Sequence, residues 1–306
     1  ANEVNIDSSM YSISRELFSY VLWEALILKI LGTDAFSIQI TNTIACTIMA
    51  ILIYFLLRKI NRQTAIVGGL LFSISPASIV LTPVLTNQHA SLLFYLLAYL
   101  LVTVERANEK FLSLLLRYFA SGILIGIGQL IRPDGIIPLL SILAFLIILS
   151  PQISFLQRSN KIFPWVLKIA QPALLGIILC IGYALPINSF ITISKVDRAR
   201  YQYLTTLNTF YKIWVGLNPE TRGTWSLEDR QLYDDLSNNQ SMDQSMLQIK
   251  IVLAERIKNI PGLFTLFSDK IDVLWIDNDY SFNWATEDTL STDEEKILET
   301  LPERKR

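Results

Sequence analysis

The sequence is poor in charge. Asp, Glu, Lys and Arg make up 17% of its 306 residues, whereas an average soluble domain has roughly 25%. The net charge of −1 combines an excess of cations in residues 1–190 with an excess of anions in residues 191–306. Nucleic-acid binding needs a clustered basic face, which neither part suggests, so we expect no nucleic-acid partner. The 52% of hydrophobic residues points instead to a protein embedded in a lipid bilayer.

Histidine and cysteine are also scarce. His89 is the only histidine, and the two cysteines, Cys46 and Cys180, each lie within an apolar run. A lone histidine makes a poor metal site, and two separated cysteines suggest neither a disulfide framework nor a ligand set. We therefore expect no metal or other cofactor, and expect both cysteines to be small core residues.

Long uncharged runs predict about six membrane-spanning helices, because roughly 20 apolar residues cross the hydrocarbon core as a helix. The run 64–104 is long enough for two of them and is interrupted at Pro83 and by the polar residues 86–89, which predicts a hairpin. The predicted spans are 35–57, the two arms of 64–104, 112–131, 135–157 and 169–194. The fold class is therefore an all-α polytopic membrane helical bundle over residues 35–194.

The segments outside the bundle have other patterns. Residues 17–31 contain Glu24 and Lys29 and are too short for a span, so we expect an interfacial helix at the end of an external loop, 1–34. Residues 195–285 predict an extracytoplasmic segment with amphipathic helices, one stopped by Pro261 and a second over 263–275 on the membrane surface. Residues 286–306 are acidic and then basic, which is typical of a flexible charged tail.

The loops between spans differ in basic residues, which sets the orientation. One set of loops holds nine cations, and the alternate short loops hold Arg132 alone. The nine are Arg58, Lys59, Arg62, Arg106, Lys110, Arg117, Arg158, Lys161 and Lys168. The basic set belongs in the cytoplasm. We therefore expect a multi-pass protein of the plasma membrane, with the turns at 84–88 and 132–135 and the C-terminal segment outside.

Polar residues at two of the external turns are candidate site residues, since polar groups near membrane depth usually face the bundle interior or a cavity. Asn87, Gln88 and His89 form the first group, although a hairpin turn satisfying its own backbone explains them equally well. Arg132-Pro133-Asp134-Gly135 forms the second. An arginine there can hold a phosphate oxyanion, or it can simply pair with Asp134 in a tight turn.

A third candidate lies after the last span, between Trp214 and Trp225. Two tryptophans flanking Asn218, Glu220 and Arg222 suit sugar stacking and hydroxyl binding, and an anchor at the membrane surface is the alternative. The pair Gly122 and Gly126, four residues apart, indicates close helix packing rather than a functional site.

Several segments in order resemble a known family. They are residues 17–32, Leu70-Leu-Phe-Ser-Ile-Ser-Pro76, Leu85-Thr-Asn-Gln88, Gly128-Gln-Leu-Ile-Arg132-Pro133 and 214–223. Over about 14–285 the chain resembles bacterial family-39-like glycosyltransferases of the GT-C superfamily, alongside protein O-mannosyltransferases and aminoarabinose transferases. The order and spacing of the segments, rather than one specific motif, carry the likeness.

The resemblance implies an inverting, metal-independent transfer of a sugar from a polyprenyl-phosphate donor to a glycan, lipid or protein acceptor outside the cytoplasm. An aspartate in the first external loop acts as general base, and cations stabilise the departing phosphate. The expected substrate-binding residues are Arg15, Glu16, Asn87, Gln88, Arg132, Trp214, Asn218 and Arg222, of which Arg15 and Glu16 match the substrate-facing loop by position.

Two departures from the family pattern concern the catalytic base. The family's first span and the acidic pair after it have no counterpart, and Asn87 or Gln88 stands where related enzymes often carry an acidic residue. We therefore expect the base upstream of residue 1, in sequence missing from a fragment, and its identity is unknown. Two other classes remain open: a transporter or permease, although no internal repeat supports it, and a non-catalytic membrane protein of the same fold.

Overall fold

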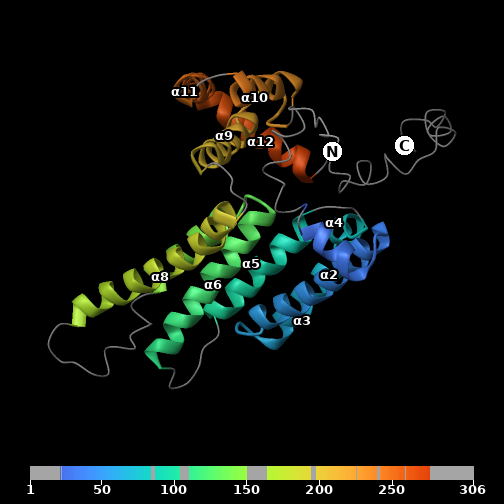
Figure 1. Cartoon of the computed structure of the whole chain (residues 1–306), viewed down its shortest axis with the longest axis vertical. Helices are drawn as coiled ribbons and strands as arrows, with labels where there is room; N and C mark the ends of the chain where they lie inside the picture. The colour runs from blue at the N-terminus through green and yellow to red at the C-terminus, as the bar shows by residue number, and fades with distance from the viewer. Residues whose placement is uncertain are drawn as a thin grey trace.

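The computed structural model describes residues 21, 23–83, 87–103, 110–149, 164–193, 198–224, 226–239, 242–258 and 260–275. Every regular element in these ranges is a helix, and none is a strand. Figure 1 shows two groups of helices, an elongated bundle and a smaller C-terminal group beyond one of its ends. The expected all-α helical membrane bundle is confirmed.

Among the described residues the bundle contains seven helices, α2 to α8, and a further helix over 23–31 precedes them. They are α2 (Ala35–Leu57), α3 (Arg62–Ser73), α4 (Pro76–Leu81), α5 (Gln88–Thr103), α6 (Phe111–Ile131), α7 (Ile136–Leu149) and α8 (Pro164–Ile193). Local chemistry sets the helix starts. Asp34 accepts a hydrogen bond from the Phe36 amide at 3.0 Å at the start of α2, and Asn61 accepts one from the Thr64 amide at 2.7 Å at the start of α3.

Three of the described helices are long and apolar enough to cross a membrane, over Phe36–Leu57, Phe111–Ile131 and Ala170–Ile193. Two shorter apolar helices, Gln88–Thr103 and Ile136–Ile148, lie where further spans were predicted. The count of about six spans therefore stays a prediction. The outward faces of these helices are apolar, since side chains such as Ile44, Ile147 and Ile177 are exposed. Such faces suit contact with lipid tails.

The predicted hairpin over 64–104 has an additional break. Its first arm stops at Ser73 and resumes as α4 at Pro76, because proline cannot donate the amide hydrogen bond that would continue α3. The second arm is α5, which begins at Gln88. The interruption at Pro83 was predicted from the sequence, and the one before Pro76 was not.

Glycines allow α6 and α8 to cross closely, and Figure 1 shows these helices side by side. A Cβ atom added to Gly122 would come within 2.2 Å of the Leu179 carbonyl oxygen, and one added to Gly126 within 2.4 Å of the Tyr183 oxygen. Gly182 of α8 lies equally close to the Phe119 oxygen, at 2.3 Å. The packing role predicted for Gly122 and Gly126 is confirmed, and the buried core of the bundle lies around this crossing.

The cysteine prediction is wrong for at least one position. Cys180 is exposed on a face of α8 that also exposes Ile177 and Ile181, and Cys46 is only partly buried. Both are free thiols. A small apolar side chain is tolerated on a lipid-facing surface, so location within an apolar run did not require burial.

The helix over 23–31 packs against the bundle. The Trp23 ring meets Phe94 of α5 edge-on, with centroids 6.1 Å apart, beside buried Ala90 and Ile131. The C-terminal group consists of α9 (Arg198–Gly216), α10 (Leu227–Asn239), α11 (Met242–Lys258) and α12 (Ile260–Trp275). As predicted, α11 ends before Pro261, which lies in the first turn of α12. The predicted tail over 286–306 lies outside the described residues.

Candidate functional site

The structure brings together two turns that the sequence offered as separate candidates. Asn87, just before α5, donates from Nδ2 to the carbonyl oxygen of Ile131 at 3.2 Å, and Arg132 Nη1 donates to Asn87 Oδ1 at 3.4 Å. The Tyr95 hydroxyl donates to the carbonyl oxygen of Arg132 at 3.0 Å. These contacts hold the end of α6 against the start of α5. We call this end of the bundle the Arg132 end.

Arg132 and Asp134 are paired across the tight turn that separates α6 from α7. Arg132 Nε donates to Asp134 Oδ2, and Lys212 of α9 donates to Asp134 Oδ1 at 3.2 Å. The side chains of Arg132, Asp134 and Lys212 are 35%, 29% and 49% exposed, so solvent or a ligand can reach all three. Lys212 was not predicted from the sequence, because neither spacing nor a motif linked it to a turn far upstream.

The cluster of Asn87, Arg132, Asp134 and Lys212, called the Arg132 cluster, carries a net positive charge. Partial burial alone would raise the pKa of Asp134, but the hydrogen bonds and charges of Arg132 and Lys212 hold it below its ordinary value. Asp134 is therefore ionised at neutral pH and compensates only one of the two cations. The charged guanidinium of an arginine, with its fork of N–H donors, is suited to bind an oxyanion such as phosphate.

A partly buried hydrogen bond fixes the shape of the turn. The amide of Gly135 donates to Gln129 Oε1 at 2.7 Å, and a Cβ atom at Gly135 would come within 2.8 Å of Gln129 Cβ and 3.2 Å of the Ile125 carbonyl oxygen. Glycine is thus required at position 135, because Gln129 and the Ile125 carbonyl leave no room for a Cβ atom. The resulting turn presents Asp134 toward α9.

The Trp214 segment has a different environment from the one expected. The Trp214 ring is fully buried in the core of the C-terminal group, so in this structure it offers no face for stacking on a sugar and no membrane anchor. Asn218 is 7% exposed and donates to Asp229 Oδ2 at 2.9 Å, while Arg256 Nη2 donates to Asp229 Oδ1 at 2.6 Å. This buried network ties α9 to α10 and α11.

The loop after Asn218 is tightly folded, and of the predicted residues in this segment Glu220 and Arg222 are exposed. The Gly223 amide donates to the Asn218 carbonyl oxygen at 2.8 Å, and φ is +53° at Arg222 and +72° at Gly223. A Cβ atom at Gly223 would lie 2.1 Å from Lys270 Cε, so α12 closes over this loop. Trp225, Arg15 and Glu16 lie outside the described residues.

His89 and Gln88 begin α5 next to the Arg132 cluster. The His89 side chain is 5% exposed, and Gln88 accepts a hydrogen bond at its carbonyl oxygen from the Ser91 hydroxyl at 3.0 Å. Within the described ranges, no group of three or more His, Cys, Asp or Glu side chains converges as a metal-ligand set would.

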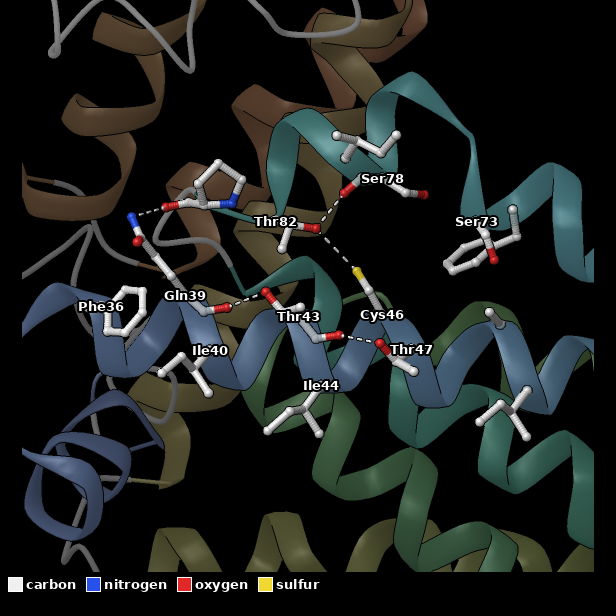
Figure 2. Close-up of a pocket in the computed structure, with 15 residues that line it drawn as sticks. Phe36, Gln39, Ile40, Thr43, Ile44, Cys46, Thr47, Ser73, Ser78 and Thr82 are labelled. Carbon is white, nitrogen blue, oxygen red and sulfur yellow. Dashed lines mark hydrogen bonds between the residues drawn. The ribbon is translucent and has the colours of Figure 1, made fainter.

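A groove of about 860 Å³ runs along α2 and opens to the outside of the bundle (Figure 2). Its wall is mostly apolar, with Phe36, Ile40, Ile44, Ile51, Phe72 and Ile79 among the lining residues. At its end nearest Asp34, Gln39 Nε2 donates to the Pro83 carbonyl oxygen at 3.1 Å. Pro83 precedes Asn87 by four residues, so this end of the groove lies within about 14 Å of Asn87 along the chain.

Most polar side chains of the groove are already hydrogen-bonded within the protein. Thr43, Thr47 and Thr82 donate to backbone carbonyl oxygens of their own helices at 2.8, 2.9 and 2.6 Å, and Cys46 Sγ lies 3.4 Å from Thr82 Oγ1 (Figure 2). Since these hydroxyl donors need no partner from a ligand, the groove suits a hydrocarbon chain better than a sugar.

Comparison with known proteins decides the family. The pattern of the dolichyl-phosphate-mannose-protein mannosyltransferase family matches residues 17–178, more than half of the chain. The chain belongs to this family. No curated protein and no solved structure matches it.

Membership of the mannosyltransferase family makes the chain a membrane glycosyltransferase of the GT-C type. At the same general level it implies a polyprenyl-phosphate sugar donor and a glycan or protein acceptor, rather than the cargo of a transporter. The matched range includes Asn87, Gln88, Arg132 and Asp134, together with the whole groove. Lys212, Asn218 and Arg222 lie beyond it, in the C-terminal group.

Proposed function

We propose that this mannosyltransferase-family protein takes a sugar from a polyprenyl-phosphate donor and transfers it to an acceptor on the extracytoplasmic side. The observation that carries the proposal is the Arg132 cluster, in which Asn87, Arg132 and Lys212 converge from three parts of the chain. It is a net cationic site at one end of the bundle.

The role proposed for the cations is to hold the donor phosphate and to stabilise it as it departs. Arg132 has the fork of N–H donors that matches phosphate oxygens, and Lys212 supplies a second cation 3.2 Å from the carboxylate that Arg132 also contacts. Asp134 holds both cations in place before the donor binds. Charge that develops on the phosphate in the transition state is then met by groups that are already oriented.

The chemistry proposed is a single displacement at the anomeric carbon. The acceptor hydroxyl oxygen forms the new bond on one face of the sugar, and the bond to the phosphate oxygen breaks on the other, which inverts the configuration. A carboxylate takes the hydroxyl proton as general base. Phosphate leaves without needing a strong general acid. The resemblance to GT-C enzymes supports a base in the first external loop, and residues 1–20 lie outside the described part of the structure.

The orientation proposed places the Arg132 end outside the cytoplasm. The support is the distribution of cations between loops, nine against Arg132 alone, which by the positive-inside rule leaves the sparse side external. The plasma membrane is proposed as the location, with the acceptor reaching the site from outside the cell.

The prenyl chain of the donor is proposed to lie in the groove along α2. The groove starts near the Arg132 end, has an apolar wall and contains hydroxyls that donate within the protein. A hydrocarbon chain there buries apolar surface without leaving polar groups unsatisfied.

Photo-crosslinking tests the proposal. A polyprenyl phosphate with a diazirine in its third isoprene unit is added to the chain in liposomes, irradiated, and the adduct is mapped by mass spectrometry. We expect adducts on α2 or α4 that excess unlabelled polyprenyl phosphate removes and that a dialkyl phosphate lacking isoprene units removes poorly. Adducts spread over the outward faces of α6, α7 and α8 and insensitive to competition would contradict it.

A further inference from the structure

The C-terminal group carries an apolar stripe that no described residue covers. On α12, Phe264 is 75% exposed, Phe267 66% and Ile271 45%. Positions three and four residues apart lie on one face of a helix, so the three side chains form a continuous row, called the α12 stripe. On the opposite face Leu266 is 3% exposed and packs inward. The helix is therefore anchored on one side and exposes large apolar groups on the other.

The position of α12 relative to the bundle narrows the choice of partner. Lys212 joins α9 to Asp134 at the Arg132 end, and Arg256 of α11 donates to the Trp214 carbonyl oxygen of α9. Lys270 of α12 lies against Gly223. The C-terminal helices are thus linked to the end of a membrane-embedded bundle, where the bilayer surface lies, and Figure 1 shows α12 crossing the direction of α6 and α8.

We infer that the α12 stripe inserts into the interfacial region of the lipid bilayer on the same side as the Arg132 end. A helix with one apolar face and polar flanks lies in the membrane plane with that face among the headgroups and upper acyl chains. The residues beside the stripe, Thr265, Ser268 and Asp272, are exposed and polar, as the water-facing flank of such a helix requires.

A second copy of the chain fits the stripe less well. A stable protein interface buries roughly 800 Å² per partner and uses about 20–30 residues on each side, whereas the stripe is one helix face wide. The bilayer needs no matching surface and is present wherever the bundle is inserted. The inference does not depend on which sugar or donor the protein uses.

Spin labelling tests the inference on the full chain in liposomes. With Cys46 and Cys180 replaced by serine, single cysteines are placed at Phe264, Phe267 and Ile271, and at Thr265 and Asp272 as controls on the same helix. Each carries a nitroxide whose relaxation by oxygen, which concentrates in lipid, is compared with relaxation by a water-soluble nickel complex. A thermal melt of each variant checks that the chain is folded.

The expected result is an oxygen-to-nickel ratio higher at all three stripe positions than at both controls. Stronger relaxation of the nitroxide by the nickel complex than by oxygen at all five positions would overturn the inference. So would dipolar broadening at the stripe positions that disappears on dilution with unlabelled chain, since that result indicates pairing of two copies.

Discussion

The Lys212 amino group lies 3.2 Å from a carboxylate oxygen of Asp134, 78 residues earlier in the chain. This contact joins the first helix of the C-terminal group to the turn that follows α6. It also brings a second cation to Arg132, whose guanidinium contacts the other oxygen of the same carboxylate. The Arg132 cluster is therefore assembled from segments inside and outside the range matched by the mannosyltransferase family.

Replacing Lys212 with alanine should weaken donor binding more than it weakens folding. The side chain is 49% exposed, so the ion pair contributes at most about 1 kcal/mol to stability. Loss of a half-exposed cation facing phosphate should lower donor affinity about fivefold, equivalent to roughly 1 kcal/mol. Titration with polyprenyl phosphate measures this, and Lys250→Ala, at an exposed position on α11, is the control. Equal affinities for the Lys212→Ala and Lys250→Ala variants would remove Lys212 from the site.

Replacing Gly122 with alanine should destabilise the bundle. The new methyl would meet the Leu179 carbonyl oxygen at 2.2 Å, and a backbone atom cannot move aside without separating α6 from α8. We expect a cost of about 1–3 kcal/mol. Gly69→Ala is the matched control, because its methyl finds the Ala50 oxygen at an ordinary 3.5 Å and alanine favours a helix. Thermal unfolding in detergent gives the comparison, and equal midpoints for both variants would refute the close crossing.

The stability of the C-terminal group should fall in acid because of Asp229. Burial alone would raise the pKa of this carboxyl, but the hydrogen bonds from Arg256 and Asn218 and the charge of Arg256 hold it below its ordinary value. A depressed pKa in the folded state stabilises the fold above the unfolded-state pKa of about 4, and this stabilisation is lost as pH falls through the folded-state value. Tryptophan-fluorescence melts from pH 7 to pH 3 follow the change, since Trp214 is buried in the same core.

The Asp229→Ala variant provides the control for this pH dependence. It leaves Arg256, whose side chain is only 19% exposed, without its carboxylate partner, so we expect about 3 kcal/mol of destabilisation at pH 7 and a smaller further loss in acid. Glu228→Ala, at an exposed neighbouring position, should change stability by less than about 0.5 kcal/mol. If wild type and Asp229→Ala lose stability in parallel below pH 4, other carboxylates are responsible.

The two ends of the bundle should differ in access to reagents that do not cross membranes. With Cys46 and Cys180 replaced, a cysteine at exposed Ile60 should remain unlabelled on intact cells, and one at exposed Thr224 should react. Permeabilised cells show that both positions are reactive. Labelling at position 60 but not 224 would reverse the orientation.

The helices were largely predictable, because burial in lipid imposes a long, uncharged pattern on the sequence. Residues 35–57 and 112–131 were predicted as spans, and α2 and α6 cover them within one residue at each end. The break before Pro76 was missed, since the flanking residues stay apolar on both sides of it. Helix ends depend on local hydrogen bonds that hydropathy does not describe.

The candidate site was predictable only in part. Arg132 and Asn87 stood out because polar residues are rare at the ends of apolar helices, yet their contact could not be deduced from positions 45 residues apart. Lys212 had no distinguishing pattern in a segment rich in charge. Trp214 suggested sugar stacking, but aromatic residues also fill cores, and only the packing of α9 against α10 and α11 shows that its ring is buried.

The proposed donor site is tested most directly by comparing the affinities of the purified wild-type chain and of Arg132→Ala for polyprenyl phosphate. A charge-assisted contact in a partly dry site is worth on the order of 2–3 kcal/mol, so Arg132→Ala should weaken binding roughly 30- to 150-fold. Arg132→Lys keeps the positive charge but loses the fork of N–H donors, so its affinity for polyprenyl phosphate should lie between those of the wild type and Arg132→Ala. An affinity within about threefold of wild type for Arg132→Ala, in a variant that melts normally, would contradict the account and leave Arg132 as a structural residue of the turn.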